Sequence, residues 1–115
     1  MRCLIVDDSG HIAASMARLL VSQGLVVVAC ARTAGEALEL AAALAPDVAI
    51  VDVELGEEDG VALSHELVAC VPSMRIILIS AHEEDDLGDL LDDSPAAGFL
   101  SKTAVGADAI ARVLG

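Results

Sequence analysis

Residues 48–52 read Val-Ala-Ile-Val-Asp, and this stretch decides the fold. Four apolar residues, three of them good strand formers, run without a polar interruption into the carboxylate of Asp52. A short apolar run bounded by polar residues is typical of a strand buried on both faces, and such strands belong to parallel sheets between layers of helices. Asp52 therefore falls at the carboxyl end of a central strand, where open α/β sheets bind their ligands.

Similar apolar runs recur along the chain and alternate with helical patterns. Further strands are predicted at residues 3–6, 25–30, 76–79 and 98–101. Helices are predicted from His11 to Gln23, between Thr33 and Pro46, from Gly60 up to Pro72, from Glu83 to Asp93 and after Lys102. Five alternations of strand and helix predict a flavodoxin-like, doubly wound α/β fold, a five-stranded parallel sheet in the order 2-1-3-4-5 with five helices on both faces.

The same patterns locate helix ends, loops and core positions. Gly24 is the expected end of the first helix, and residues 53–59 are expected to form a polar loop. The three cysteines lie in apolar surroundings without Cys-x-x-Cys spacing, which predicts buried free thiols rather than a disulfide or a zinc site. The predicted apolar stripes are Ile12, Met16, Leu19 and Leu20 in the first helix, Leu63, Leu67, Cys70 and Val71 in the third, and Ala107, Ile110, Ala111 and Leu114 in the last.

Size and charge narrow the classes of function. The chain's 115 residues fit one domain, residues 1–115, and we expect no output domain within it. Nineteen acidic residues against six basic ones give a net charge of −13, which argues against direct contact with nucleic acid or an anionic membrane. The longest apolar run, residues 25–31, is far shorter than the roughly 18 residues of a membrane span. No signal-peptide pattern is present, so a cytoplasmic protein is expected.

Polar residues gather at one end of the predicted sheet, because the carboxyl ends of parallel strands face the same way. Asp7 and Asp8 follow the first strand, Asp52 ends the third, and Ser80 and Lys102 arrive on the fourth and fifth. Three carboxylates at close range need a counter-charge, which the chain's only lysine and a hard cation such as Mg²⁺ can supply. The set fits phosphoryl transfer to a carboxylate nucleophile, with the hydroxyl bonding one oxygen of the product.

At these positions the sequence resembles the response-regulator receiver domains of two-component signalling, and the resemblance covers the whole chain. The chain departs from the family at Gly56 and Thr103, where receivers usually have proline, and we expect a trans peptide or a shifted loop after Lys102. The matching features, in order, are the pair Asp7-Asp8, the run Asp52-x-x-Leu55-x-x-x-Asp59-Gly60, Ser80-Ala81 after the fourth strand, and Phe99 three residues before Lys102.

The resemblance implies a magnesium site and a phosphorylation site. Asp8 and Asp52 would ligate Mg²⁺ directly, Glu54 would do so through its backbone carbonyl, and Asp7 would act through water. Asp52 would accept the phosphoryl group from a sensor histidine kinase, with Lys102 neutralising charge. The domain would then be a phosphoacceptor that assists its own phosphorylation, not an enzyme acting on other substrates.

The resemblance also implies a switch. Ser80 would move toward the phosphate and Phe99 would change rotamer, which alters the surface of the last two helices and last strand. That surface would signal to an output domain or downstream protein, such as a DNA-binding domain outside this chain, because residues 98–103 look most like receivers attached to helix-turn-helix outputs. The resemblance also allows a homodimer that forms on phosphorylation. We expect the side chains of Glu54 and His82 to tune the lifetime of the phosphorylated form.

Three alternatives share this fold. A receiver-like module could act in protein interactions without being phosphorylated, although such modules typically lose an acid or the lysine. A flavin or nucleotide binder would need a glycine- or hydroxyl-rich phosphate loop after the first strand, where Asp7 and Asp8 stand instead. An aspartate-nucleophile phosphatase normally carries its nucleophile at the end of the first strand, in a longer chain.

Overall fold

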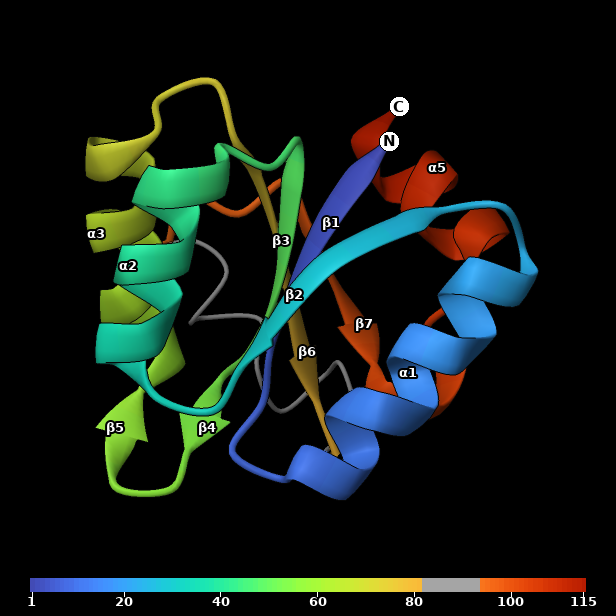
Figure 1. Ribbon diagram of the computed structural model, residues 1–115, viewed down its shortest axis with the longest axis horizontal. Helices are drawn as coiled ribbons and strands as arrows, with labels where there is room; N and C mark the ends of the chain where they lie inside the picture. Colours follow the sequence, from blue (N-terminus) through green and yellow to red (C-terminus); the bar gives the residue numbers. More distant parts are fainter. Residues whose placement is uncertain (82–93) are drawn as a thin grey trace.

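The computed structural model describes residues 1–81 and 94–115, and Figure 1 shows a parallel sheet between two layers of helices. The five strands follow the order β2-β1-β3-β6-β7. This order confirms the predicted 2-1-3-4-5 arrangement, because β6 and β7 are the fourth and fifth strands of this sheet along the chain. The strands are β1 (Arg2–Val6), β2 (Val26–Ala31), β3 (Val48–Asp52), β6 (Arg75–Ser80) and β7 (Gly98–Ser101).

Strand β3 forms the centre of the sheet, since it pairs with β1 on one side and with β6 on the other. Val51 lies opposite Val6 of β1, and Asp52 lies opposite Ile79 of β6. All five residues of β3 are buried, as the uninterrupted apolar run predicts. This register brings the ends of β1, β3 and β6 together at one end of the sheet, which we call the carboxyl edge.

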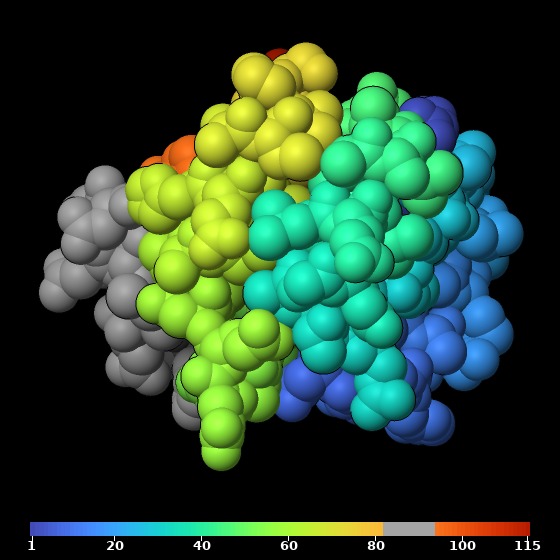
Figure 2. Space-filling model, turned by 60° about the vertical axis from the view of Figure 1, so that its left-hand side comes forward, coloured from blue at the N-terminus to red at the C-terminus, as the bar shows by residue number. Residues whose placement is uncertain are grey.

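Helices cover both faces of the sheet. Helices α1 (Gly10–Ser22) and α5 (Ala107–Leu114) pack on one face, and α2 (Ala34–Leu44) and α3 (Gly60–Cys70) lie side by side on the other (Figure 1; Figure 2). The core is divided accordingly into two buried clusters, one on each face. The predicted helix at residues 83–93 lies outside the described residues. Within the described ranges, no helix combines the length and apolarity that a bilayer crossing requires.

The helix ends follow the sequence signals closely. Thr33 Oγ1 accepts the backbone N–H of Glu36 at 3.1 Å, as in the predicted capping box. The return bond is shifted by one residue, because Glu36 Oε1 accepts the N–H of Arg32 at 2.8 Å. Gly24 follows α1 with a left-handed φ of +92°, which confirms it as the stop of the first helix.

The prediction of a polar loop at residues 53–59 is wrong. The segment contains an antiparallel hairpin of β4 (Glu54–Leu55) and β5 (Glu58–Asp59), which turns at Gly56 with φ +62°. Leu55 is buried, and Glu58 Oε1 accepts the backbone N–H of Ala34 at 3.0 Å, which ties the hairpin to the first turn of α2. Periodicity could not reveal the hairpin, because each strand is only two residues long.

Some side chains assigned to the core are exposed. Helix α1 contacts the sheet through a narrower stripe than predicted. This stripe buries Ala13, whereas the more apolar Ile12 and Leu19 are exposed. The thiol of Cys30 faces solvent because β2 is an edge strand, and Cys70 is exposed in the last turn of α3. Helix α5 buries Ala109 beside Ile110. The exposed residues are Ile12, Leu19, Cys30, Cys70 and Ala111; Cys3 is buried, and all three cysteines are free.

Candidate functional site

Consecutive acids at the end of β1 point in different directions. Asp7 is fully buried, whereas Asp8 is exposed. The backbone N–H of Asp7 donates to the carbonyl of Ala31 at 3.0 Å, which holds the chain against β2 after the strand has ended. Asp52, at the end of β3, is 3% exposed. The carboxyl edge therefore presents the three predicted carboxylates, and the structure shelters two of them and leaves one open to solvent.

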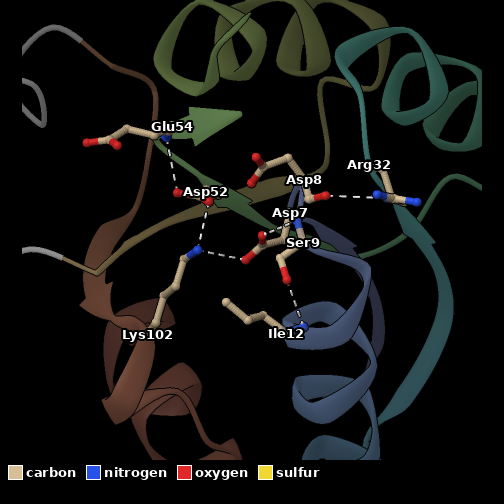
Figure 3. Close-up of polar contacts among 8 residues, drawn as sticks. All are labelled: Asp7, Asp8, Ser9, Ile12, Arg32, Asp52, Glu54 and Lys102. Atoms are coloured by element: carbon tan, nitrogen blue, oxygen red, sulfur yellow. Dashed lines mark hydrogen bonds and ion pairs between the residues drawn. The ribbon is translucent and has the colours of Figure 1, made fainter. Parts of the chain in front are cut away.

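Lys102 supplies the positive charge among these acids. Its Nζ lies 2.8 Å from Asp52 Oδ2 and 3.0 Å from Asp7 Oδ2 (Figure 3). The lysine begins a 3₁₀ turn, Lys102–Ala104, directly after β7, and Ser101 caps this turn by accepting the N–H of Thr103. The Lys102–Thr103 peptide is trans, one of the two outcomes expected. The single lysine of the chain thus bridges the two sheltered carboxylates.

Backbone donors hold the second oxygen of each sheltered carboxylate. Asp52 Oδ1 accepts the N–H of Glu54 at 3.0 Å, and Asp7 Oδ1 accepts the N–H of Ser9 at 2.9 Å (Figure 3). Ser9 in turn caps α1 by accepting the N–H of Ile12 at 3.2 Å. The orientation of both carboxylates is therefore built into the turns that follow β1 and β3.

The pKa values at the site reflect burial and charge together. Burial raises the pKa of Asp52 above its ordinary value, although the Lys102 ammonium and the Glu54 N–H act in the opposite direction. Burial alone would lower the pKa of Lys102, but hydrogen bonds and attraction from Asp52 and Asp7 outweigh it and raise that pKa. Lys102 is therefore charged at neutral pH, and one ammonium faces three acids.

The donor set fits a hard divalent cation. One carboxylate oxygen from each of Asp7, Asp8 and Asp52 can be chosen so that all lie within 4.8 Å of one another. Asp7 Oδ2 is buried, and within the described part of the chain the Lys102 ammonium at 3.0 Å is its compensation. Oxygen ligands at this spacing suit Mg²⁺ or Ca²⁺, and an ion would offset the excess negative charge.

A small pocket opens beside the acids. Its volume is about 210 Å³, enough for a phosphoryl group with an ion and a few waters but too small for a flavin or a nucleotide. Gly56 enlarges the entrance, because a Cβ at this position would lie 3.6 Å from Asp8 Oδ2. The pocket is lined by Asp8, Asp52, Glu54, Gly56, Ser80, Ala81 and Lys102. It therefore unites predicted residues from the ends of four strands, β1, β3, β6 and β7.

Phe99, a further predicted site residue, does not line this pocket. Phe99 is 6% exposed and packs in the core cluster beneath α2 and α3. His82 lies outside the described residues, so its predicted tuning role stays a prediction. His65 is exposed on α3.

Two supporting residues were missed by sequence reasoning. Arg32 Nε donates to the backbone carbonyl of Asp8 at 3.3 Å (Figure 3), and its side chain lies over Gly10. Gly60 allows the start of α3 to approach β3, since a Cβ there would come within 2.9 Å of Val53 Cα. The Asp-Gly pair of the receiver motif pointed to Gly60, but no sequence signal points to Arg32, whose contact arises from the pairing of β1 with β2.

Comparison with known proteins agrees with this geometry. The response regulator receiver domain family matches residues 3–114. The chain is 30% identical over 105 residues to the response regulator GacA of Pseudomonas aeruginosa, covering 90% of this chain and 49% of GacA. It is 29% identical over 102 residues to the DNA-binding transcriptional activator EvgA of Escherichia coli K12, covering 89% and 50%.

A solved structure is similar over nearly the whole chain. A response regulator from Burkholderia pseudomallei, crystallised with a phosphorylated aspartic acid, a calcium ion and citrate, superposes with a TM-score of 0.83 at 28% identity. The match covers 99% of this chain and 66% of that one. The chain therefore belongs to the response regulator receiver domain family of two-component systems. It spans about half the length of the curated relatives that it matches.

Proposed function

We propose that this domain receives a phosphoryl group on Asp52 from a sensor histidine kinase. The observation that carries the proposal is the position of Lys102, which bridges Asp7 and Asp52 beside an open pocket. An ammonium group at that point can neutralise an oxygen of a phosphoryl group bonded to Asp52. Membership of the receiver family and the phosphorylated aspartic acid of the Burkholderia relative support the same role.

The transfer uses Asp52 as the nucleophile. One carboxylate oxygen forms a bond to phosphorus, the bond from phosphorus to the donor histidine nitrogen breaks, and the imidazole leaves with that electron pair. The N–H of Glu54 keeps the carboxylate in position, because it binds Oδ1. Lys102 and the hydroxyl of Ser80, both of which line the pocket, bind oxygens of the product.

Mg²⁺ is the cation that we propose for the acidic cluster. Asp8 and Asp52 would bind it through their side chains, Glu54 through its backbone carbonyl, and Asp7 through water. The cation supplies charge neutralisation to the phosphoryl group, and Mg²⁺ suits this task because it keeps exchangeable waters. The exposure of Asp8 leaves the solvent side of the cluster accessible to an incoming ion.

Phosphorylation of Asp52 is then passed on as a change of surface. Ser80 moves toward the phosphate and Phe99 changes rotamer, which alters the surface formed by the last two helices and β7. We propose that residues 1–115 act as one cytoplasmic receiver domain whose target is an output domain or partner protein. The similarity to EvgA favours a transcriptional target. Phosphorylation-dependent pairing of two copies and lifetime tuning by the Glu54 side chain belong to the same proposal.

Phosphorylation in vitro tests the proposal directly. Incubation with Mg²⁺ and a small acyl phosphate donor should add one phosphoryl group to the intact mass of the wild-type protein. Asp52→Asn should abolish the addition, whereas Asp108→Asn, at an exposed acid in α5, should not. Chelation of Mg²⁺ should also prevent it. A mass gain that persists in Asp52→Asn, or its absence from the wild type, would exclude Asp52 as the acceptor and favour an interaction module that is never phosphorylated.

A further inference from the structure

Charge is distributed very unevenly along the chain. Residues 9–35, which contain α1 and β2, include no aspartate or glutamate, so all nineteen acids lie elsewhere. The same segment contains Arg18 and Arg32, two of the six basic residues. Arg32 lies at the carboxyl edge, where its Nε donates to the carbonyl of Asp8. The groove between α1 and β2 therefore has the positive charge of Arg18 and no acid in its lining, although the protein as a whole is strongly acidic.

The same part of the chain contains exposed apolar side chains. Among the described residues, every large apolar side chain that is exposed lies within the first 26 positions. Val21 on α1 and Val26 on β2 are the most open, at 56% and 54% exposure. Singly exposed apolar residues are ordinary, but a local concentration without acids is typical of a surface that binds another protein.

Val21 lines a groove between α1 and β2 at the margin of the sheet. In Figure 1 β2 crosses in front of the other strands with α1 beside it, and β2 is the outermost strand of the sheet order. The groove between them is almost entirely apolar, and Arg18 is its only charged lining residue. Among the described residues no strand pairs with the outer side of β2, so backbone donors and acceptors there are open to a partner. The apolar lining comes from Ala17, Val21, Val27, Ala29 and Cys30.

We propose that the groove between α1 and β2 binds an extended, acidic and apolar segment of a partner protein, which adds a strand to the outer side of β2. Apolar side chains of that segment fill the groove, and its carboxylates approach Arg18. The interaction goes beyond the proposed phosphotransfer and does not depend on it, because none of the groove residues lines the Asp52 pocket.

Charge selects this occupant over others. A nucleic acid or an anionic membrane presents an extended anionic surface that would also face the nineteen acids outside residues 9–35, whereas a short peptide segment contacts only the groove, whose one charged lining residue is Arg18. A second copy paired through β2 would place the same basic, acid-free surface on both sides of the interface, without a complementary charge. A helical partner would leave the backbone groups of β2 unpaired, whereas a strand satisfies them. The register shift between β1 and β2 at Val28 limits regular pairing to a short strand, so the groove side chains contribute to recognition.

Binding of designed peptides tests the proposal. The probes are a twelve-residue peptide of alternating Val and Glu, the same design with Lys in place of Glu, and a Val-Glu peptide N-methylated on every second Val. Amide shifts are recorded on isotope-labelled protein by NMR. The Val-Glu peptide should shift residues of β2 and of the facing side of α1 in a saturable manner, and the other two peptides should bind clearly more weakly.

Charge reversal in the protein provides the matched comparison. Arg18→Glu should lower the affinity for the Val-Glu peptide about fivefold, as expected when one exposed ion pair is replaced by a repulsive pair. Arg75→Glu, at an exposed arginine that begins β6, should leave the affinity unchanged. Equal binding of the Lys peptide or of the N-methylated peptide would overturn the proposal. Shifts confined to the carboxyl edge, or no shifts at millimolar peptide, would overturn it as well.

Discussion

Proteins usually expose charged groups and bury apolar ones, and the carboxyl edge and the outer side of β2 depart from this pattern in opposite ways. The carboxyl edge buries charge: Asp7 is inaccessible, and Asp52 is 3% exposed. The margin formed by α1 and β2 exposes apolar groups, among them Val21 of α1 and Val26 of β2. Buried charges and clustered exposed apolar groups both carry a cost in free energy, so each region calls for an explanation beyond folding.

The two regions differ in how this cost is offset within the chain. At the carboxyl edge, the Lys102 ammonium and the N–H groups of Ser9 and Glu54 compensate the buried carboxylates. At β2, no described strand covers the outer side. Substitutions should therefore disturb a tightly interdependent structure in the first region and leave the fold nearly unaffected in the second.

Gly60→Ala should have the largest effect on stability. A Cβ at Gly60 would come within 2.9 Å of Val53 Cα and closer still to the carbonyl of Asp52, and backbone atoms cannot easily move aside. We expect a loss of about 3–5 kcal/mol in the free energy of unfolding, measured by urea denaturation. Gly35→Ala, at an open position in α2, should instead stabilise by about 0.5–1 kcal/mol. Equal small effects at both positions would contradict the tight approach of α3 to β3.

Lys102→Met should be the next most damaging change. Without the ammonium, the sheltered carboxylates of Asp7 and Asp52 lose their shared partner, and we expect a loss of about 3 kcal/mol in Mg²⁺-free buffer. Addition of Mg²⁺ should restore part of this stability. The double variant with Asp52→Asn should lose less than the single variant, because one of the repelling charges is gone. A double variant as unstable as Lys102→Met would show that repulsion is not the cause.

Much of the carboxyl edge could be predicted because its residues are placed by strand order alone. An apolar run ending in Asp52 identifies the end of a buried strand, and parallel pairing brings the end of β1 beside it. Lys102 could be placed opposite the acids by the same rule, since it follows β7 directly. These inferences needed only the order and direction of the strands, not the details of packing.

What could not be predicted depends on packing at the margins of the sheet. Ile12 and Leu19 have helical spacing, yet they are exposed because α1 lies near the margin and reaches the sheet through a narrow stripe. Cys30 is open to solvent because β2 has a neighbour on one side only. Arg32 reaches the carbonyl of Asp8 across 24 positions of sequence. Spacing along the chain contains none of this information.

Arg32→Ala should have a moderate effect that is seen in Mg²⁺ affinity. Loss of its hydrogen bond to the Asp8 carbonyl should make Asp8 less well positioned and weaken Mg²⁺ binding about 3- to 10-fold. This is the low end of the loss in affinity expected when a residue that positions a metal ligand is removed. Coulomb's law alone predicts the opposite sign, since removal of a positive charge should tighten cation binding. Calorimetric titration distinguishes the two, with Arg75→Ala at the opposite end of the sheet as control. Tighter binding in Arg32→Ala would exclude the positioning role.

Val26→Thr should have the smallest effect, and it contrasts with the same substitution in the centre of the sheet. Valine and threonine are both β-branched and of similar size, so the exchange mainly replaces a methyl group by a hydroxyl group. At Val26, which is 54% exposed, water can solvate this hydroxyl, and the free energy of unfolding should change by less than about 0.5 kcal/mol. At Val51, which is fully buried in β3, the same change should cost about 1–3 kcal/mol. A comparable loss at both positions would show that the apolar surface of β2 serves the fold rather than a partner.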